Sequence, residues 1–193
     1  MREKAHKVLF LMEAKRTVEK MCWIQADLPY RCMLAVPCSQ RRGRLALLWM
    51  EEIDLHIQTF LLNHIDAMIM NVISPWHFTG FYGWPEEQRK QESWRLLKHL
   101  RSRSLAPWFC CGDFNEILSS EEKQGGLPKP LKQMQVFRET LLHFELVDLG
   151  FSGNIFTWDN GRLGEDFVQE RLDRACATLA WRDLFPHAKD TYI

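Results

Sequence analysis

The chain has 193 residues, of which 46% are hydrophobic and 26% are charged, and these values are close to the averages for soluble globular domains. This length and composition predict one folded domain over residues 1–193 and argue against an intrinsically disordered chain. Lys plus Arg and Asp plus Glu each number 25, so the formal net charge is zero. A protein that coats nucleic acid only by non-specific charge usually carries a basic excess, so the composition argues against that class.

The cysteines and the apolar runs limit the cellular setting. The six cysteines form no Cys-x-x-Cys pair and no Cys/His cluster with zinc spacing, so we expect reduced structural thiols in a reducing compartment. The apolar run at residues 8–12 is five residues long, which is too short for a signal peptide or a membrane span. We therefore expect an intracellular protein, nuclear or cytoplasmic, with no membrane partner.

Short apolar or alternating runs predict strands in the first half of the chain. The predicted strands span residues 8–12, 45–50, 53–60, 65–73 and 76–82. Apolar residues at helical spacing predict a helix over residues 17–28, which Pro29 ends. The basic segment at residues 41–44 predicts a solvated turn, with contact to DNA phosphates as the alternative.

The second half combines helices with strands. A helix is predicted from Pro85 onward, because Pro is favoured in a first turn and acidic residues follow it. Its buried stripe is Trp94, Leu97 and Leu100. The other predicted elements are a helix over 133–144 with Met134, Phe137 and Leu141 inward, a short helix near 179–184, strands over 108–111, 154–158 and 168–176, a surface loop over 121–132 and a turn at 159–161. This order favours mixed sheets covered by helices over a strict βαβ winding.

The best local signal for chemistry is Gly112-Asp113-Phe114-Asn115, which follows an apolar strand. Strand alternation places Asp113 and Asn115 on one side and turns Phe114 into the core. The carboxylate can orient or deprotonate a water, and the amide can donate to a phosphate oxygen. The alternative is an Asx-capped turn, where Asp and Asn are common for structural reasons.

Two further carboxylates stand at or near predicted strand ends. Glu13 follows the run at 8–12 and is a natural Mg²⁺ ligand, because hard cations prefer oxygen donors; the alternative is a helix-entry acid paired with Lys15 or Arg16. Asp173 lies on the same predicted face as Arg171. It can orient a histidine, or it can form a local ion pair with one of the flanking arginines.

Aromatic and histidine side chains give weaker signals. The phenol of Tyr82 can donate to a phosphate oxygen or pack over a turn, and Trp158 can stack on a sugar or base or belong to the core. The histidines show no ligand spacing. His56, His64 and His77 lie in strand-like segments and are expected to be structural or exposed.

These segments together resemble the endonuclease/exonuclease/phosphatase (DNase I-like) superfamily, and more narrowly the endonuclease domain of plant LINE-type retrotransposons. The resemblance covers nearly the whole chain, from about Val8 to Ile193. The matching stretches are Phe10-Leu11-Met12-Glu13-Ala14-Lys15, Gly43 to Trp49, Thr79-Gly80-Phe81-Tyr82-Gly83-Trp84-Pro85, Gly112-Asp113-Phe114-Asn115-Glu116-Ile117, Phe156-Thr157-Trp158 and Glu170-Arg171-Leu172-Asp173-Arg174-Ala175.

The resemblance implies an α/β (α+β) fold, a four-layered sandwich of two mixed sheets flanked by helices. It also implies hydrolysis of a DNA phosphodiester with Mg²⁺ or Mn²⁺ and no other small-molecule cofactor. The implied roles are metal binding by Glu13, water activation by Asp113, phosphate contact by Asn115 and Tyr82, orientation of a histidine by Asp173, and substrate contact by Trp158 and Arg171.

The chain also departs from the family pattern. The family's first strand carries an Asn and its last segment reads Ser-Asp-His, and neither appears here. His187 lies too early to replace that histidine, and Ala14 and Arg44 stand where the family has Thr and Gly. The resemblance therefore implies a domain incomplete at both terminal strands, with weak or lost activity. An inactive remnant, a nucleic-acid-binding module and a phosphatase on the same fold are the alternatives.

Overall fold

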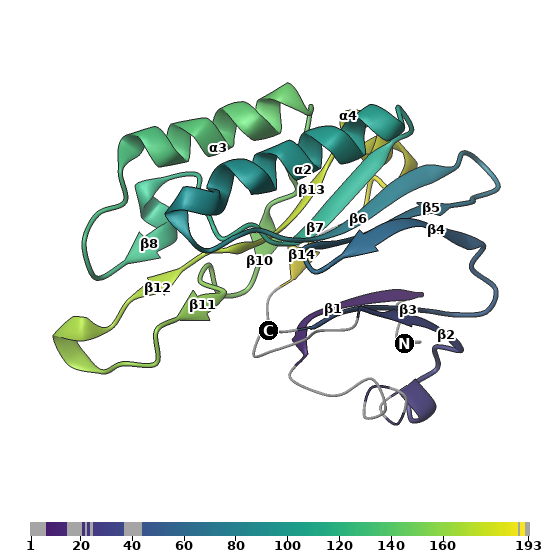
Figure 1. Ribbon diagram of the computed structural model, residues 1–193, viewed down its shortest axis with the longest axis horizontal. Coiled ribbons are helices and arrows are strands. Elements are labelled where there is room, and N and C mark those ends of the chain that lie inside the picture. The colour runs from purple at the N-terminus through teal and green to yellow at the C-terminus, as the bar shows by residue number, and fades with distance from the viewer. Residues whose placement is uncertain are drawn as a thin grey trace. The chain divides into compact units, whose positions relative to one another are not determined.

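The computed structural model describes residues 7–14, 21, 23, 25–36, 44–188 and 190–191. The chain divides into two compact units, residues 1–82 and residues 83–193. Both units carry strands, and the helices labelled in Figure 1 all belong to the second. In the parts of the chain described here, no helix has the length and apolarity needed to cross a bilayer.

One sheet of the first unit has the order β1-β3-β2, with both neighbouring pairs antiparallel. Its strands are β1 (Val8–Ala14), β2 (Cys32–Ala35) and β3 (Arg44–Trp49). The central strand β3 is buried on both faces, with Leu45 to Leu48 at most 2% exposed, as expected for a continuous apolar run. The predicted strands at 8–12 and 45–50 are thereby confirmed.

Three antiparallel strands form the other layer of this unit, in the order β4-β5-β6. They are β4 (Leu55–Leu61), β5 (His64–Ile69) and β6 (Trp76–Tyr82). The two layers meet where the ring of Phe10 in β1 crosses Gly80 in β6, so closely that a Cβ on this glycine would lie 2.3 Å from a ring atom. Phe10 also meets Phe78 edge-to-face at 6.1 Å between ring centroids.

Some boundaries in the first unit differ from the prediction. The strand predicted over 65–73 ends at Ile69, and Val72 and Ile73 are exposed in the loop that follows. Residues 21, 23, 25 and 26 are helical, in agreement with the predicted helix over 17–28, whose other positions up to 24 lie outside the described residues. The predicted basic turn lies outside them too, except for Arg44, which begins β3.

The second unit is built around two long helices that run side by side (Figure 1). A 3-10 turn η1 (Glu87–Arg89) leads into α2 (Lys90–Arg103), and α3 (Leu131–His143) follows later in the chain. Both predicted apolar stripes are buried, and Trp94 of α2 stacks on Phe137 of α3 with ring centroids 5.1 Å apart. The predicted inward faces of both helices are therefore confirmed.

Three neighbouring strands of the second unit pair antiparallel in the order β7-β13-β9. They are β7 (Trp108–Asp113), β13 (Asp173–Ala177) and β9 (Val147–Asp148). A smaller antiparallel sheet has the order β11-β12-β8, and β10 pairs with β14 in parallel. These short strands are β8 (Lys123–Gln124), β10 (Phe151–Ser152), β11 (Trp158–Asp159), β12 (Gln169–Glu170) and β14 (Asp190–Thr191). Short helices η2 (Ser120–Glu122), η3 (Gly164–Asp166) and α4 (Leu179–Leu184) complete the unit.

Three predictions for this unit need correction. The strand predicted over 154–158 is wrong except at Trp158, because Asn154 Oδ1 accepts the Phe156 main-chain N–H in a turn. The strand predicted over 168–176 is interrupted, since the main-chain N–H of Arg171 bonds to Glu122 O. The predicted surface loop over 121–132 contains β8, and Glu122 within it is buried.

Candidate functional site

The end of β7 brings Asp113 and Asn115 together. Strand alternation buries Gly112 and leaves Asp113 half-buried, and Phe114 then turns fully into the core. The main-chain N–H of Asn115 donates to Asp113 Oδ1 at 2.6 Å, and its side-chain Nδ2 donates to Asp113 Oδ2 at 2.7 Å. The first of these bonds is the Asx turn given above as the alternative. The turn and the candidate site are thus the same structure, because the turn presents an oriented carboxylate.

Asn115 is held from the segment before α2 as well. Its Nδ2 also donates to the main-chain oxygen of Gly83 at 3.0 Å, and the Gly83 N–H donates to Asp113 O at 2.7 Å. Gly83 lies so close to Phe114 that a Cβ there would come within 2.5 Å of the Phe114 carbonyl oxygen. Only glycine fits this approach. Asn115 itself has a φ of 54°, which is uncommon for a residue with a side chain.

Asp173 lies directly opposite Asp113 in the antiparallel register of β7 and β13. Side chains at directly paired positions project to one face with Cβ atoms about 4.5–5.5 Å apart, so the two carboxylates are neighbours. The hydroxyl oxygen of Thr157 accepts the main-chain N–H groups of Leu172 and Asp173, each at 3.0 Å. Thr157, from the segment before β11, therefore sets the entry of β13.

A buried ion-pair cluster supports the same strand, made of Arg171, Arg174, Glu122 and Asp148. Arg174 is 2% exposed, and its Nη1 donates to Glu122 Oε1 at 2.9 Å and to Asp148 Oδ2 at 2.8 Å. Arg171 donates to the same two carboxylates, at 3.0 Å each. Two positive and two negative charges compensate one another, as buried charges require.

The cluster shifts the pKa of its carboxyl groups. Burial alone would raise the pKa of Glu122, but the Arg174 hydrogen bond and charge outweigh it and hold that pKa below its usual value. In Asp148, burial is likewise outweighed, mainly by the Arg171 hydrogen bond, and the pKa is lowered. Sequence reasoning missed both acids, because they lie 23 to 52 positions from the arginines they bind.

The structure places Arg171 and Trp158 in different environments. Arg171 was expected at the substrate, but it is 4% exposed and its guanidinium binds Glu122 and Asp148 and lies 4.5 Å from the Phe151 ring. Arg171 and Arg174 were expected as local ion-pair partners of Asp173, but both bind the more distant acids Glu122 and Asp148. Trp158 is 45% exposed on β11, where its indole is accessible to a planar ligand.

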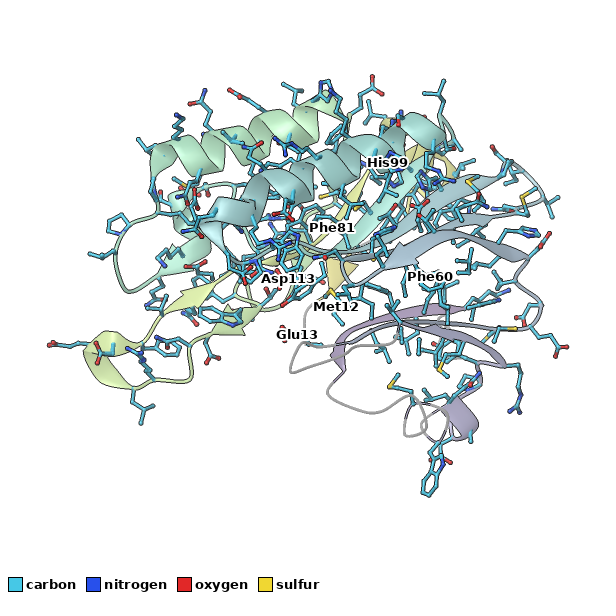
Figure 2. All side chains as sticks on the ribbon, viewed as in Figure 1. Met12, Glu13, Phe60, Phe81, His99 and Asp113 are labelled. Atoms are coloured by element: carbon cyan, nitrogen blue, oxygen red, sulfur yellow. The ribbon has the colours of Figure 1, made fainter. Side chains whose placement is uncertain are left out.

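In the first unit, Glu13 and Tyr82 form a second cluster. The Tyr82 hydroxyl donates to Glu13 Oε1 at 3.0 Å. Glu13 is exposed at the end of β1 (Figure 2), in a bulge against β3, with a φ of 52°. The main chain of Tyr82 is fixed at both polar groups by Asn63, since Asn63 O accepts from Tyr82 N and Asn63 Nδ2 donates to Tyr82 O, both at 2.8 Å.

The donor chemistry of Glu13 fits a hard divalent cation. Among the described residues, no three His, Cys, Asp or Glu side chains cluster as a metal cage. Mg²⁺ is often held by one or two carboxylates, with waters and substrate phosphates completing its shell. An exposed carboxylate oriented by a phenol is compatible with that mode of binding.

Two other groups of polar or titratable side chains are buried away from these clusters. His77 lies 2.6 Å from Asp66 Oδ1, and Thr79 donates to the same oxygen at 2.7 Å, all three at most 1% exposed. Cys110 and Cys176 are paired across β7 and β13 and fully buried, and burial raises the pKa of the Cys176 thiol strongly. The prediction of structural histidines and inert thiols agrees with these environments.

Residues 4–190 match the family model described as Endonuclease/Exonuclease/phosphatase family. The chain belongs to this family. Its mixed sheets flanked by helices are the DNase I-like α/β fold expected from the resemblance.

Solved structures of other proteins share this fold at low sequence identity. A 3′ phosphatase, NExo from Neisseria, is 16% identical over 92% of this chain and 78% of its own, with a TM-score of 0.67. The endonuclease domain of TRAS1, a telomere-specific non-LTR retrotransposon, is 16% identical over 79% and 69%, with a TM-score of 0.64. An AP endonuclease from Archaeoglobus fulgidus is 16% identical over 89% and 76%, with a TM-score of 0.62. No curated protein sequence matches the chain significantly.

Proposed function

We propose that this family member is a Mg²⁺- or Mn²⁺-dependent DNA endonuclease of the LINE retrotransposon type. The observation that carries the proposal is the carboxylate of Asp113, which accepts the main-chain N–H and one side-chain N–H of Asn115 and lies opposite Asp173. An oriented carboxylate at a strand end can take the proton of an attacking water, which is the central need of phosphodiester hydrolysis. The fold shared with a retrotransposon endonuclease domain supports the choice of DNA as substrate.

In this proposal, Asp113 accepts the proton of the water that attacks phosphorus. Asn115 has a double task. Both hydrogens of its amide are used, one by Asp113 and one by Gly83. Contact with a phosphate oxygen therefore exchanges the bond to the neutral Gly83 carbonyl for a charge-assisted one, which is stronger. The resemblance gives Asp173 the orientation of a histidine, but no histidine of this sequence stands at the family's position. The proposal therefore uses Asp173 only as the acid opposite Asp113, whose main chain Thr157 holds in place.

Glu13 and Tyr82 are assigned to the cation and the phosphate. The carboxylate of Glu13 supplies a hard oxygen ligand, and the Tyr82 hydroxyl, now on Glu13, can donate to a phosphate oxygen. A bound divalent cation neutralises phosphate charge and stabilises the departing oxygen. Trp158 is assigned to stacking on a base or sugar, since its indole is accessible. Arg171 is assigned to the support of β13.

The test is nicking of supercoiled plasmid by the purified chain, with Mg²⁺ and with EDTA, beside the variants Asp113→Ala and Asp183→Ala. Asp183 is an exposed aspartate on α4 and serves as the matched control. Because no histidine stands at the family's position, we expect weak metal-dependent nicking, which Asp113→Ala removes and Asp183→Ala retains.

An absence of nicking by folded protein would overturn the endonuclease proposal. A parallel assay with a 3′-phosphorylated oligonucleotide then separates the three alternatives, of which an inactive remnant would neither release phosphate nor bind the oligonucleotide. Metal-dependent release of phosphate would assign the same residues to a phosphatase. Binding of the oligonucleotide without turnover, unchanged by Asp113→Ala, would indicate a nucleic-acid-binding module.

A further inference from the structure

Lys90, the first residue of α2, is a charged residue that the roles above do not use. Its side chain is 7% exposed, and its Nζ donates to the main-chain oxygen of Asn115. A lysine is rarely buried to this degree unless it is paired. Its nearest carboxylate, Glu116 Oε2, lies 3.9 Å from Nζ, at the long limit of an ion pair. The principal contact of this buried charge is thus the backbone of Asn115.

The position that Lys90 contacts is the strained one. Asn115 has a φ of 54°, a left-handed backbone that costs most residues with a side chain roughly 1–2 kcal/mol and asparagine less. Such a conformation persists only where the surroundings over-determine it. Here Asp113 accepts the main-chain N–H, Gly83 accepts from the side chain, and Lys90 donates to the main-chain oxygen. Lys90 thus holds Asn115 through its main-chain carbonyl group.

We propose that Lys90 is a positioning residue, which holds Asn115 and through it the Asp113 carboxylate in the geometry for hydrolysis. This inference rests on the proposed function and extends it to a residue without substrate contact. A charged donor on a main-chain carbonyl gives a stronger bond than a neutral one. Loss of that bond frees the left-handed turn to relax, which moves the amide that orients Asp113.

The surroundings of Lys90 set the pKa of its ammonium group. Burial is the largest cause that lowers the pKa of Lys90, to about 8, and Lys129 lowers it further, while Glu116, Asp113 and Glu87 oppose the shift. Lys129 binds Glu116 at 2.9 Å and so competes for the carboxylate nearest to Lys90. Lys90 and Glu116 both line a cavity of about 320 Å³.

The chain offers matched variants. Lys90→Met removes the donor and keeps the length of the side chain, and Lys90→Arg keeps a permanent charge and donors. Lys132→Met is the control, because Lys132 is an exposed lysine that lines the same cavity. The readouts are the single-turnover nicking rate and the plasmid concentration at half-saturation.

We expect Lys90→Met to lower the nicking rate by roughly 10- to 100-fold, the range for loss of a supporting contact, with little change in half-saturation. Lys90→Arg restores most of the rate, and Lys132→Met stays at the wild-type rate. The ratio of the wild-type rate to the Lys90→Arg rate should fall as pH rises through about 8, because only the lysine loses its charge there. A wild-type rate in Lys90→Met, or a pH-independent ratio, would overturn the inference.

A second measurement separates this inference from the proposed function. The side-chain amide signals of Asn115 can be followed by NMR in wild type and variants, without any turnover. We expect Lys90→Met to shift them and to speed their hydrogen exchange at least tenfold, with no such change in Lys132→Met. If folded wild type does not nick DNA, the proposed function fails, and unchanged Asn115 signals in Lys90→Met would then overturn the positioning role as well. If Lys90→Met does not fold, the pH dependence of the Asn115 signals in wild type and Lys90→Arg decides.

Discussion

Glu13 in the first unit and Asp113 in the second are both candidate carboxylates at strand ends, and they are supported very differently. Glu13 is exposed, has a left-handed backbone of its own, and takes one hydrogen bond from Tyr82. Asp113 is half-buried, and the left-handed backbone beside it belongs to Asn115, which reaches it with two donors. The first carboxylate is accessible and lightly held, and the second is oriented by its neighbours.

The contrast matches the chemistry proposed for each. A cation ligand can adapt as ligands and waters exchange around it, whereas a proton acceptor must be aimed at one water. Backbone strain alone does not mark either site. Glu145 also has a positive φ, of 57°, but it lies after the end of α3, where such a conformation commonly terminates a helix. A positive φ therefore points to a site only where a candidate carboxylate lies at or beside the left-handed residue, as at Glu13 and Asn115.

The largest effect should come from the oriented carboxylate. Asp113→Asn keeps the shape of the side chain and removes its basicity, so we expect the nicking rate to fall by about 10²- to 10⁴-fold. The melting temperature should fall only slightly, because one of the two acceptors for Asn115 is lost. Single-turnover nicking and thermal unfolding of the same preparation measure the two. A variant that nicks within threefold of wild type would refute Asp113 as the proton acceptor.

Next comes the support of the second unit. Arg174→Met leaves the buried Glu122 and the half-buried Asp148 with half their counter-charge, and breaking such a cluster costs roughly 3–5 kcal/mol of unfolding free energy. Urea unfolding measures the loss. The exposed Arg182 on α4 is the control, and Arg182→Met should change the free energy by less than about 0.5 kcal/mol. Equal effects of the two variants would contradict the role given to the cluster.

The same cluster predicts a pH dependence. Because the pKa of Glu122 and that of Asp148 are lowered in the folded protein, both carboxyl groups bind more protons when unfolded. Their contribution is therefore complete above the ordinary pKa of 4.5 for Glu122 and is lost as pH falls toward the folded values. The unfolding free energy of wild type should decrease below that pH more steeply than that of Glu122→Gln. Parallel slopes would show that the cluster does not control acid stability.

The smallest effect tests the lightly held carboxylate. Glu13→Gly relieves the left-handed backbone and should raise the unfolding free energy by about 1 kcal/mol, while it removes the cation ligand. Urea unfolding and the Mg²⁺ concentration for half-maximal nicking check the two parts. A gain in stability with a raised Mg²⁺ requirement is expected. Unchanged Mg²⁺ dependence would separate Glu13 from the metal.

The sequence predicts the parts of this fold that have strong local periodicity. The strand over 76–82 and the inward faces of α2 and α3 follow directly from alternation and helical spacing. The sequence also predicts Asp113 beside Asn115, but the Asx turn after the end of β7 brings them together, and not strand alternation. The strand predicted over 154–158 fails because the chain turns at Asn154, whose Oδ1 accepts the Phe156 main-chain N–H, despite the apolar pattern.

What local pattern could not predict depends on partners distant in the chain. Glu122 looks like a surface acid in a polar loop until Arg174, 52 positions later, is brought to it. Lys90 looks like a solvated helix residue until Asn115 arrives 25 positions later. The functional roles of the site residues stay predictions, to be decided by the variants above.

The neutral cluster of Arg171, Arg174, Glu122 and Asp148 also constrains how this chain can change over time. Each arginine bonds both acids, so replacement of any one member leaves an uncompensated charge in the interior. Double replacements of one arginine and one acid should therefore be far less harmful than the sum of the single ones. Divergent relatives should keep all four residues of this cluster or replace them together by apolar residues. We therefore expect these four positions to covary.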